Sequence, residues 1–110
     1  MARLCTAVLA ILAFTGCTVE EKDFPESYGE AYCHRLKVCN RADFDDAYDD
    51  IDECVDDSSN VIDDEGDLLE VLGLDYDEET ATECVNAIRT SDCDDFGDAD
   101  YVSDCNNVWS

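Results

Sequence analysis

The sequence contains little of what common enzyme active sites require. There is one histidine, His34, so any acid–base or nucleophilic mechanism that uses histidine depends on this residue. The chain has no G-x-S-x-G nucleophile motif, no glycine-rich phosphate loop and no H-E-x-x-H zinc motif. Pairs of carboxylates carry no information in a chain with 30 acidic residues. We therefore predict no catalytic residue, no cofactor and no enzymatic activity, and we interpret His34 as a surface or helix-packing residue.

Basic residues are scarce as well, at six Lys and Arg against 30 Asp and Glu, and the formal net charge is −24. Nucleic acid binding needs a basic footprint, so this balance excludes nucleic acid as a partner. The one basic patch that we predict surrounds His34 and contains Arg35, Lys37 and Arg41. Such a charge by itself would favour disorder. The cysteines and a clear helical periodicity argue against disorder.

The sequence also lacks an apolar run long enough to cross a bilayer. The longest run, residues 7–14, has eight residues, whereas a spanning helix needs about twenty. Arg3 precedes this run, and the two together are typical of a bacterial signal peptide. We predict that residues 1–16 form that signal peptide.

Cys17 follows the apolar run directly, and the chain then becomes acidic. Residues 14–17, F-T-G-C, resemble the bacterial lipobox, with the departure that Phe14 replaces the usual Leu, Val or Ile. An ordinary signal-peptidase site would place the bulky Phe14 at −3, which fits poorly. We therefore predict that Cys17 carries the lipid, with residues 17–24 as an acidic tether. Thr18, rather than Asp, follows Cys17, and by resemblance to enterobacterial sorting this favours the outer membrane of the cell envelope.

The cysteine count supports a lipidated Cys17. Of the eight cysteines, Cys5 would leave with the signal peptide, and a free Cys17 would leave an odd number in an oxidising compartment. With Cys17 lipidated, six remain that can all pair: Cys33, Cys39, Cys54, Cys84, Cys93 and Cys105.

Helical periodicity dominates the rest of the chain, and no segment alternates as a half-buried strand would. In residues 42–57 the apolar positions Phe44, Ala47, Tyr48, Ile51 and Val55 recur at spacings of three and four, which predicts one helix with Asp43 as its N-cap. We expect further helices from a Ser27/Glu30 capping box to about residue 40, around Leu68 to Leu72 before Gly73, from Asp77 with a Thr80/Glu83 capping box, and from about Asp98. Residues 58–60 are predicted to be a loop.

We therefore predict that residues 25–110 form an all-α domain, a small bundle of four to five short helices cross-linked by about three disulfides. Six cysteines allow fifteen full pairings. Cys33 and Cys39 lie about 9 Å apart along one predicted helix, beyond the roughly 7 Å that a disulfide can span, which excludes their pairing. Among the remaining pairings we prefer Cys39–Cys54 and Cys84–Cys105, which leaves Cys33–Cys93.

Metal binding is the main alternative role for the polar residues. The cysteine spacings contain no C-x2-C or C-x4-C knuckle, so disulfides are favoured over zinc. Asp92, Asp94, Asp98 and Asp100 resemble the start of a calcium-binding EF-hand loop, with Gly97 at its sixth position. Phe96 and Ser103 then occupy positions that need an oxygen ligand and a bidentate Glu. We predict an acidic coat, with weak calcium or other cation binding as the alternative.

The layout as a whole is similar to a known group of proteins. The lipobox, the acidic tether, the segments YCHRLKVC, IDECVDD and ATECVNAIRTSDC, and a last cysteine near the end resemble the small cysteine-rich lipoproteins of myxobacteria. The resemblance implies an exported lipoprotein with an all-α domain and transfers no catalytic residue. We predict a membrane-anchored, non-enzymatic interaction or envelope-structural module, whose partner is an envelope protein or a cation.

Overall fold

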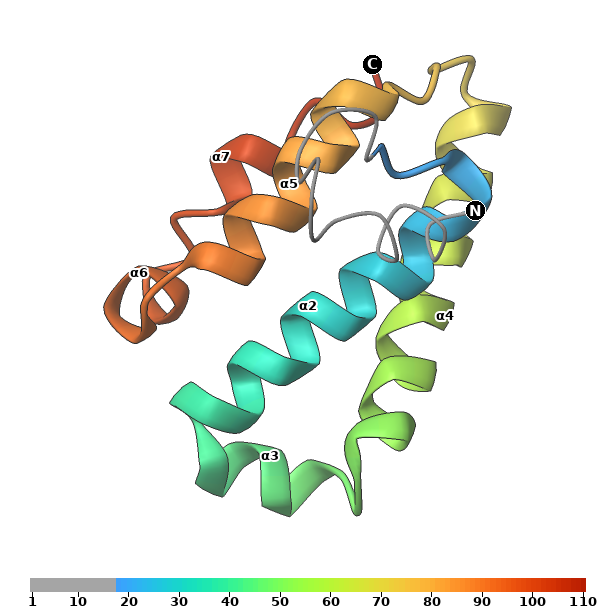
Figure 1. Cartoon of the computed structure of the whole chain (residues 1–110). Helices are drawn as coiled ribbons and strands as arrows, with labels where there is room; N and C mark the ends of the chain where they lie inside the picture. The colour runs from blue at the N-terminus through green and yellow to red at the C-terminus, as the bar shows by residue number, and fades with distance from the viewer. Residues whose placement is uncertain (1–17) are drawn as a thin grey trace.

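The computed structural model describes residues 18–110, and these residues form an all-α domain (Figure 1). A 3-10 helix η1 (Glu21–Asp23) leads into α2 (Phe24–Cys39), the central helix. The helices that follow are α3 (Arg41–Ala47), α4 (Ile51–Val71), α5 (Glu78–Thr90), α6 (Cys93–Gly97) and α7 (Val102–Cys105). Helix α2 contacts α3, α4, α5 and α6, most extensively α4. The predicted all-α bundle is confirmed.

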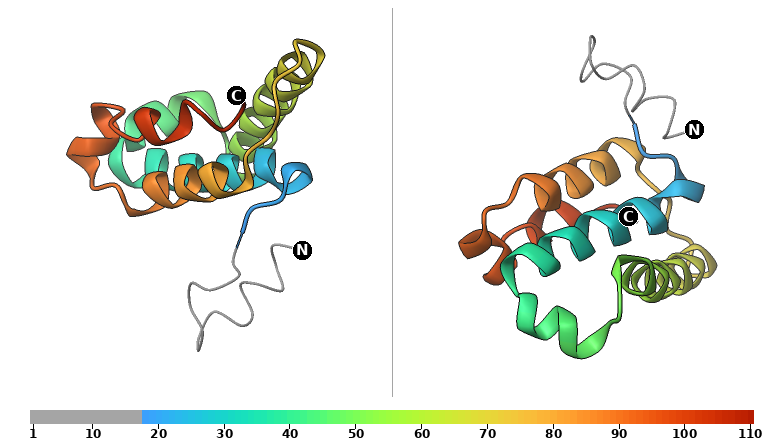
Figure 2. Two further views of the ribbon diagram at one scale, coloured as in Figure 1. Left: turned by 90° about the horizontal axis from the view of Figure 1, so that it is seen from above. Right: turned by 60° about the horizontal axis from the view of Figure 1, so that its bottom comes forward.

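Helix α2 lies in the middle of the domain, and other helices pack on two sides of it. Figure 2 shows α5 beside α2 on the side from which residues 18–20 enter, with α4 on the opposite side. The larger core cluster joins α2, α5 and the C-terminal segment, and its buried residues are Phe24, Ala31, Ala81, Cys84, Val85, Ile88, Phe96 and Val108. A smaller cluster of Cys33, Phe44 and Cys54 lies where α2, α3 and α4 meet. The fold is thus held by two modest cores instead of one large one.

The predicted helix over residues 42–57 is two helices in the structure. Helix α3 ends at Ala47, and Tyr48 is extended, with φ −137° and ψ 147°. The Asp50 carboxylate accepts a hydrogen bond from Glu53 N at 2.9 Å, and Glu53 Oε1 accepts one from Asp49 N at 2.6 Å. The Asp50 cap starts a new helix at Ile51 because it satisfies a backbone donor that a helix start leaves unpaired, and the Glu53 carboxylate binds the residue before the cap. The apolar residues keep their spacing of three and four across this break, so the periodicity of the sequence did not indicate it.

The predicted loop at residues 58–60 and the separate apolar turn near Leu68 were wrong as well. Both segments belong to α4, which runs unbroken for 21 residues. The helix ends before Gly73, which has φ +90°, a conformation that glycine adopts without strain. The prediction that Gly73 follows a helix end is therefore confirmed.

Other predicted helix starts need correction. Helix α2 begins at Phe24, so Ser27 and Glu30 lie in its interior and form no capping box. Helix α5 does begin after Asp77, but its cap is the Asp77 carboxylate, which accepts from Thr80 N at 3.0 Å. The helix expected from Asp98 is replaced by α6 and α7, which a turn with Ala99 at φ +59° separates.

The segment predicted to be an acidic tether is packed against the domain over residues 19–24. Val19 N donates to Thr82 Oγ1 at 2.8 Å, and Tyr76 Oη donates to the Val19 carbonyl at 2.7 Å. Phe24 is 4% exposed and belongs to the larger core cluster. Val19 is partly buried against the same cluster, so these two apolar side chains help to hold an otherwise polar segment in place.

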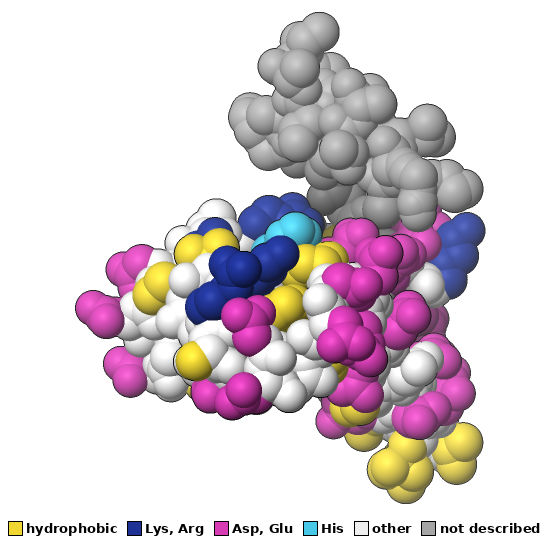
Figure 3. Space-filling view, turned by 90° about the horizontal axis from the view of Figure 1, so that it is seen from below, with side chains coloured by type: hydrophobic (Ala, Val, Ile, Leu, Met, Phe, Trp, Pro, Cys, Tyr) yellow, Lys and Arg dark blue, Asp and Glu magenta, His cyan; other side chains and the backbone are white. Residues whose placement is uncertain are grey.

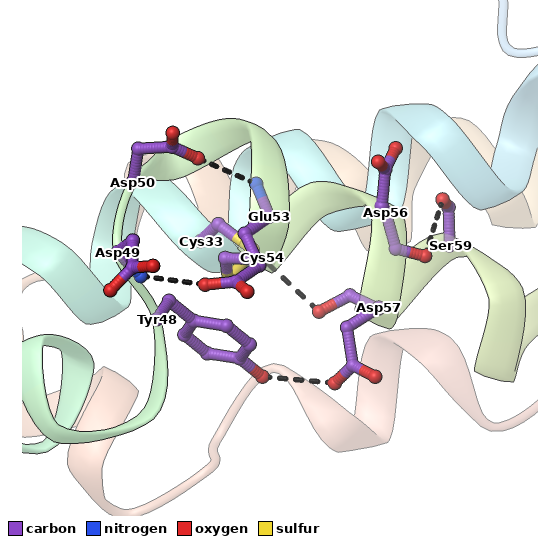
Figure 4. Close-up of a disulfide and its surroundings, with 10 residues drawn as sticks. Cys33, Tyr48, Asp49, Asp50, Glu53, Cys54, Asp56, Asp57 and Ser59 are labelled. Carbon is purple, nitrogen blue, oxygen red and sulfur yellow. Dashed lines mark hydrogen bonds between the residues drawn. A yellow bond between two sulfur atoms is a disulfide. The ribbon is translucent and has the colours of Figure 1, made fainter.

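All six cysteines of residues 18–110 are paired, as Cys33–Cys54, Cys39–Cys93 and Cys84–Cys105. The preferred Cys84–Cys105 bond is confirmed, and the other two predicted pairs are wrong because their partners are exchanged. Cys33 is fully buried against Cys54 in the α2–α4 contact (Figure 4), and Tyr48, Asp50 and Glu53 surround this bond. Cys39, in the last turn of α2, is left to face α6. The pairing differs from the prediction because the helix breaks at Tyr48. The chain reversal places Cys54 beside Cys33, which lies more than one helical turn before the predicted partner Cys39.

Candidate functional site

The predicted lipid attachment residue, Cys17, lies outside the described residues. The chain is fixed directly after it, because Val19 is bound through its backbone to both Thr82 and Tyr76. Of residues 18–110, no helix is long and apolar enough to cross a membrane. The three disulfides indicate an oxidising, extracytoplasmic compartment.

The predicted basic patch has one member that was not expected, Arg89. His34, Arg35 and Arg89 line a shallow hollow of about 290 Å³ together with Glu30 and Ala31. Arg89 comes from α5, far away in the sequence, and only the packing of α5 on α2 brings it there. Figure 3 shows most of the Lys and Arg side chains and the single histidine gathered on this face.

The other two expected members of the basic patch have different partners. Lys37 Nζ lies 5.7 Å from the centre of the Phe44 ring. The guanidinium of Arg41 forms an ion pair with Asp45 at 3.3 Å on the surface of α3. His34 is exposed, in accordance with its interpretation as a surface residue.

The four aspartates of the calcium alternative have structural roles or lie on the surface. The Asp92 carboxylate caps α6 by accepting a hydrogen bond from Asp95 N at 2.8 Å. The charge of Asp92 is the main cause that raises the pKa of the Asp95 carboxyl. Within residues 18–110, no group of three or more His, Cys, Asp or Glu is arranged to hold a metal ion. The structure therefore does not bring Asp92, Asp94, Asp98 and Asp100 together as ligands.

A concave site of the described chain, which we call the acidic cleft, was not predicted. It has a volume of about 700 Å³ and lies between η1, the start of α2, the second half of α4 and the C-terminal segment. Three aromatic residues, Phe24, Tyr76 and Trp109, line its apolar part. Its rim carries six carboxylates: Glu20, Glu21, Asp63, Asp67, Glu70 and Glu78.

The aromatic wall of the acidic cleft is fixed by backbone pairing. Tyr76 and Trp109 form an isolated antiparallel bridge, and Asp75 and Ser110 exchange two backbone hydrogen bonds of 2.9 and 3.0 Å. The Tyr76 and Trp109 rings meet edge to face with their centres 5.0 Å apart. Gly66 makes room for the indole, because a Cβ there would lie 2.9 Å from Trp109 Cζ2.

The carboxylates of the acidic cleft are close enough to affect one another. A hydrogen bond to Glu70 is the main cause that raises the pKa of the Glu21 carboxyl, followed by burial and by the charge of Glu70. Burial, followed by the charges of Glu78 and Glu21, raises the pKa of the Tyr76 hydroxyl. The one basic residue at the cleft is Lys22. The site is thus strongly electronegative.

Sequence reasoning missed the acidic cleft because its parts come from four separate segments. No single segment has a periodicity that joins Glu21, Gly66, Tyr76 and Trp109. One local signal was present: Gly66 interrupts a helical pattern, and such a glycine often marks the close approach of another group.

An exposed apolar group lies at the C-terminal end of α4. Leu68, Val71 and Leu72 are 59%, 83% and 65% exposed, although they follow the helical spacing of a buried face. Leu68 and Leu72 were predicted to belong to a short apolar turn. In the structure all three residues lie in the last turn of α4 or at its C-cap, and neither core cluster includes them.

Comparisons with protein-family models, with curated proteins and with solved structures find no match to this chain.

Proposed function

We propose that the protein is an exported bacterial lipoprotein, held in a membrane by a lipid on Cys17, whose acidic helical domain serves as a non-enzymatic interaction module. The resemblance to the small cysteine-rich lipoproteins of myxobacteria belongs to this proposal. The F-T-G-C sequence and the even number of the remaining cysteines support the anchor. Thr18 at the second position favours delivery to the outer membrane.

The F-T-G-C sequence carries the proposal, and the fixed position of Val19 predicts how the anchored domain would lie on the membrane. Because Val19 is bound to Thr82 and Tyr76, a lipid on Cys17 would hold the α2–α5 side of the domain close to the bilayer. This is the side with the basic hollow of His34, Arg35 and Arg89. Cations there would face anionic headgroups, whereas α4 lies on the opposite side (Figure 2).

The anchor is tested by Cys17→Ser in the native host. We expect wild-type protein to partition into detergent, with the mass of a diacylglyceryl group on an N-terminal Cys17, and the variant to accumulate as unprocessed precursor. Thr18→Ser is the matched control and should be processed normally. Mature wild-type protein with an unmodified Cys17 would contradict the proposal.

A further inference from the structure

The acidic cleft has the shape and size of a binding site. Its volume of about 700 Å³ lies in the middle of the range for ligand sites, roughly 300 to 1,000 Å³. Phe24 is almost fully buried and belongs to the core, whereas Trp109 remains half-buried and lines the cleft. Tyr76 packs between these two rings, 5.9 Å from Phe24 and 5.0 Å from Trp109. The wall of the cleft is therefore formed by packed rings that belong to the fold itself.

The negative charge of the acidic cleft favours a positively charged ligand. Six carboxylates converge on it and one lysine accompanies them, so a bound group with several positive charges would be stabilised. Glu21, from η1, and Glu70, from α4, both line the cleft, so their negative charges repel each other. A cation between them would replace this repulsion by attraction.

The aromatic residues of the acidic cleft favour an organic cation over a metal ion as its ligand. Guanidinium and ammonium groups are attracted to the faces of tryptophan and tyrosine rings, and guanidinium is the more weakly hydrated of the two. Calcium prefers a shell of six to eight oxygen ligands, and the described chain holds no group arranged for a metal. A second copy of this chain is disfavoured as the occupant, because each copy has a formal charge of −24.

We propose that the acidic cleft binds a basic peptide segment of a partner protein, with an arginine side chain against Tyr76 and Trp109 and its charge between Glu21 and Glu70. This assignment deepens the proposed function and rests on it for the role of an interaction module. It names the class of partner, a cationic segment with at least two basic residues, and the surface that recognises it.

Trp109 is the only tryptophan of the chain, so its fluorescence reports on the acidic cleft alone. The full chain, with its disulfides formed, is titrated with a blocked tetra-arginine peptide at low ionic strength. We expect a saturable change in Trp109 emission with one peptide per chain, and weaker binding as salt is added. A blocked tetra-glutamine peptide should give no saturable change. Spermine has four charges without a guanidinium group and should bind at least tenfold more weakly.

Two double variants with the same change in charge test where the peptide binds. Glu21→Gln/Glu70→Gln should weaken peptide binding at least tenfold. Asp43→Asn/Asp46→Asn makes the same change in charge on α3, at the other end of α2 (Figure 1), and should weaken binding less than threefold. Circular dichroism checks that both variants are folded.

Three results would overturn the inference: no response of Trp109, an equal loss of affinity in both double variants, or spermine binding as tightly as the peptide. The second result would mean that the whole acidic coat attracts the peptide. The outcome is separate from that of the anchor test. An unmodified Cys17 leaves peptide binding intact, and absent peptide binding leaves lipidation intact.

Discussion

Gly66 and Trp109 are a pair in which the absence of one side chain makes room for another. The indole occupies the place of a Cβ on α4, and the Tyr76 ring and the Asp75–Ser110 backbone pairing hold the indole there. Gly66→Ala would gain up to about 1 kcal/mol in helix propensity and lose about 1 to 3 kcal/mol through overpacking.

We expect Gly66→Ala to lower the free energy of unfolding by about 1 kcal/mol and to shift the emission of Trp109, measured by urea unfolding. Gly97→Ala is the control, because a Cβ there meets no atom within 4 Å and Gly97 also lies in a helix. Equal effects at the two positions would contradict the packing argument.

The Glu21–Glu70 pair predicts a pH dependence at the same scale. Because the pKa of Glu21 is raised in the folded state, the folded protein binds the Glu21 proton more tightly than the unfolded chain does. The resulting stability is present below the ordinary value of 4.5 and is lost as the pH rises through the raised value. Glu70→Gln removes the cause of this loss. The pair is exposed, so we expect the variant to gain no more than about 0.5 kcal/mol at neutral pH.

Urea unfolding near pH 4 and near pH 7 measures this difference, which should be smaller at the lower pH. Asp46→Asn removes a charge elsewhere and should show no such step. A gain from Glu70→Gln that is the same at both pH values would mean that only net charge matters.

At the scale of the elements, the break between α3 and α4 decides both the helix count and the cysteine pairing. The Asp50 cap holds this break, so Asp50→Ala should lower the free energy of unfolding by about 1 kcal/mol. Asp46→Ala on α3 is the control, since it removes the same charge from an exposed position without a cap. If the two variants were equally stable in thermal unfolding, the cap would have no structural role.

The same break shows what was predictable from the sequence. Amphipathic spacing predicted the all-α class and a helix start near Asp77, because each depends on a local pattern. The Cys84–Cys105 link was also predicted, although α6 and α7 replace the helix expected from Asp98. The spacing of Phe44 through Val55 stayed helical across a chain reversal, so only the Asp50-x-x-Glu53 pattern marked the new start. Cys33 and Cys39 lie on one helix, and which of them meets Cys54 depends on where that reversal occurs. The acidic cleft needed tertiary contacts between four segments and had no local signal beyond Gly66.

At the scale of the whole molecule, repulsion between negative charges lowers the stability of the fold. Thirty carboxylates repel one another over a domain with a radius of gyration of 14.0 Å. Added sodium chloride shortens the screening length from about 30 Å at 0.01 M to about 8 Å at 0.15 M, so the melting temperature should rise smoothly. A specific ion site would instead saturate.

At a fixed sodium chloride concentration near 0.15 M, we expect millimolar calcium to raise the melting temperature no more than magnesium does. Differential scanning fluorimetry measures both. A saturable and calcium-selective rise that is lost in Asp92→Asn/Asp94→Asn would support the calcium alternative against the acidic coat.

The three disulfides overlap along the chain. Cys33–Cys54 spans the first part, Cys39–Cys93 the middle and Cys84–Cys105 the end, with no gap between them. A protease that cuts any one peptide bond between Cys33 and Cys105 therefore leaves the two fragments covalently joined. A nicked molecule would migrate as one chain on a non-reducing gel and as two after reduction. With the proposed lipid on Cys17, a domain cross-linked in this way would stay attached to its anchor after a single cut.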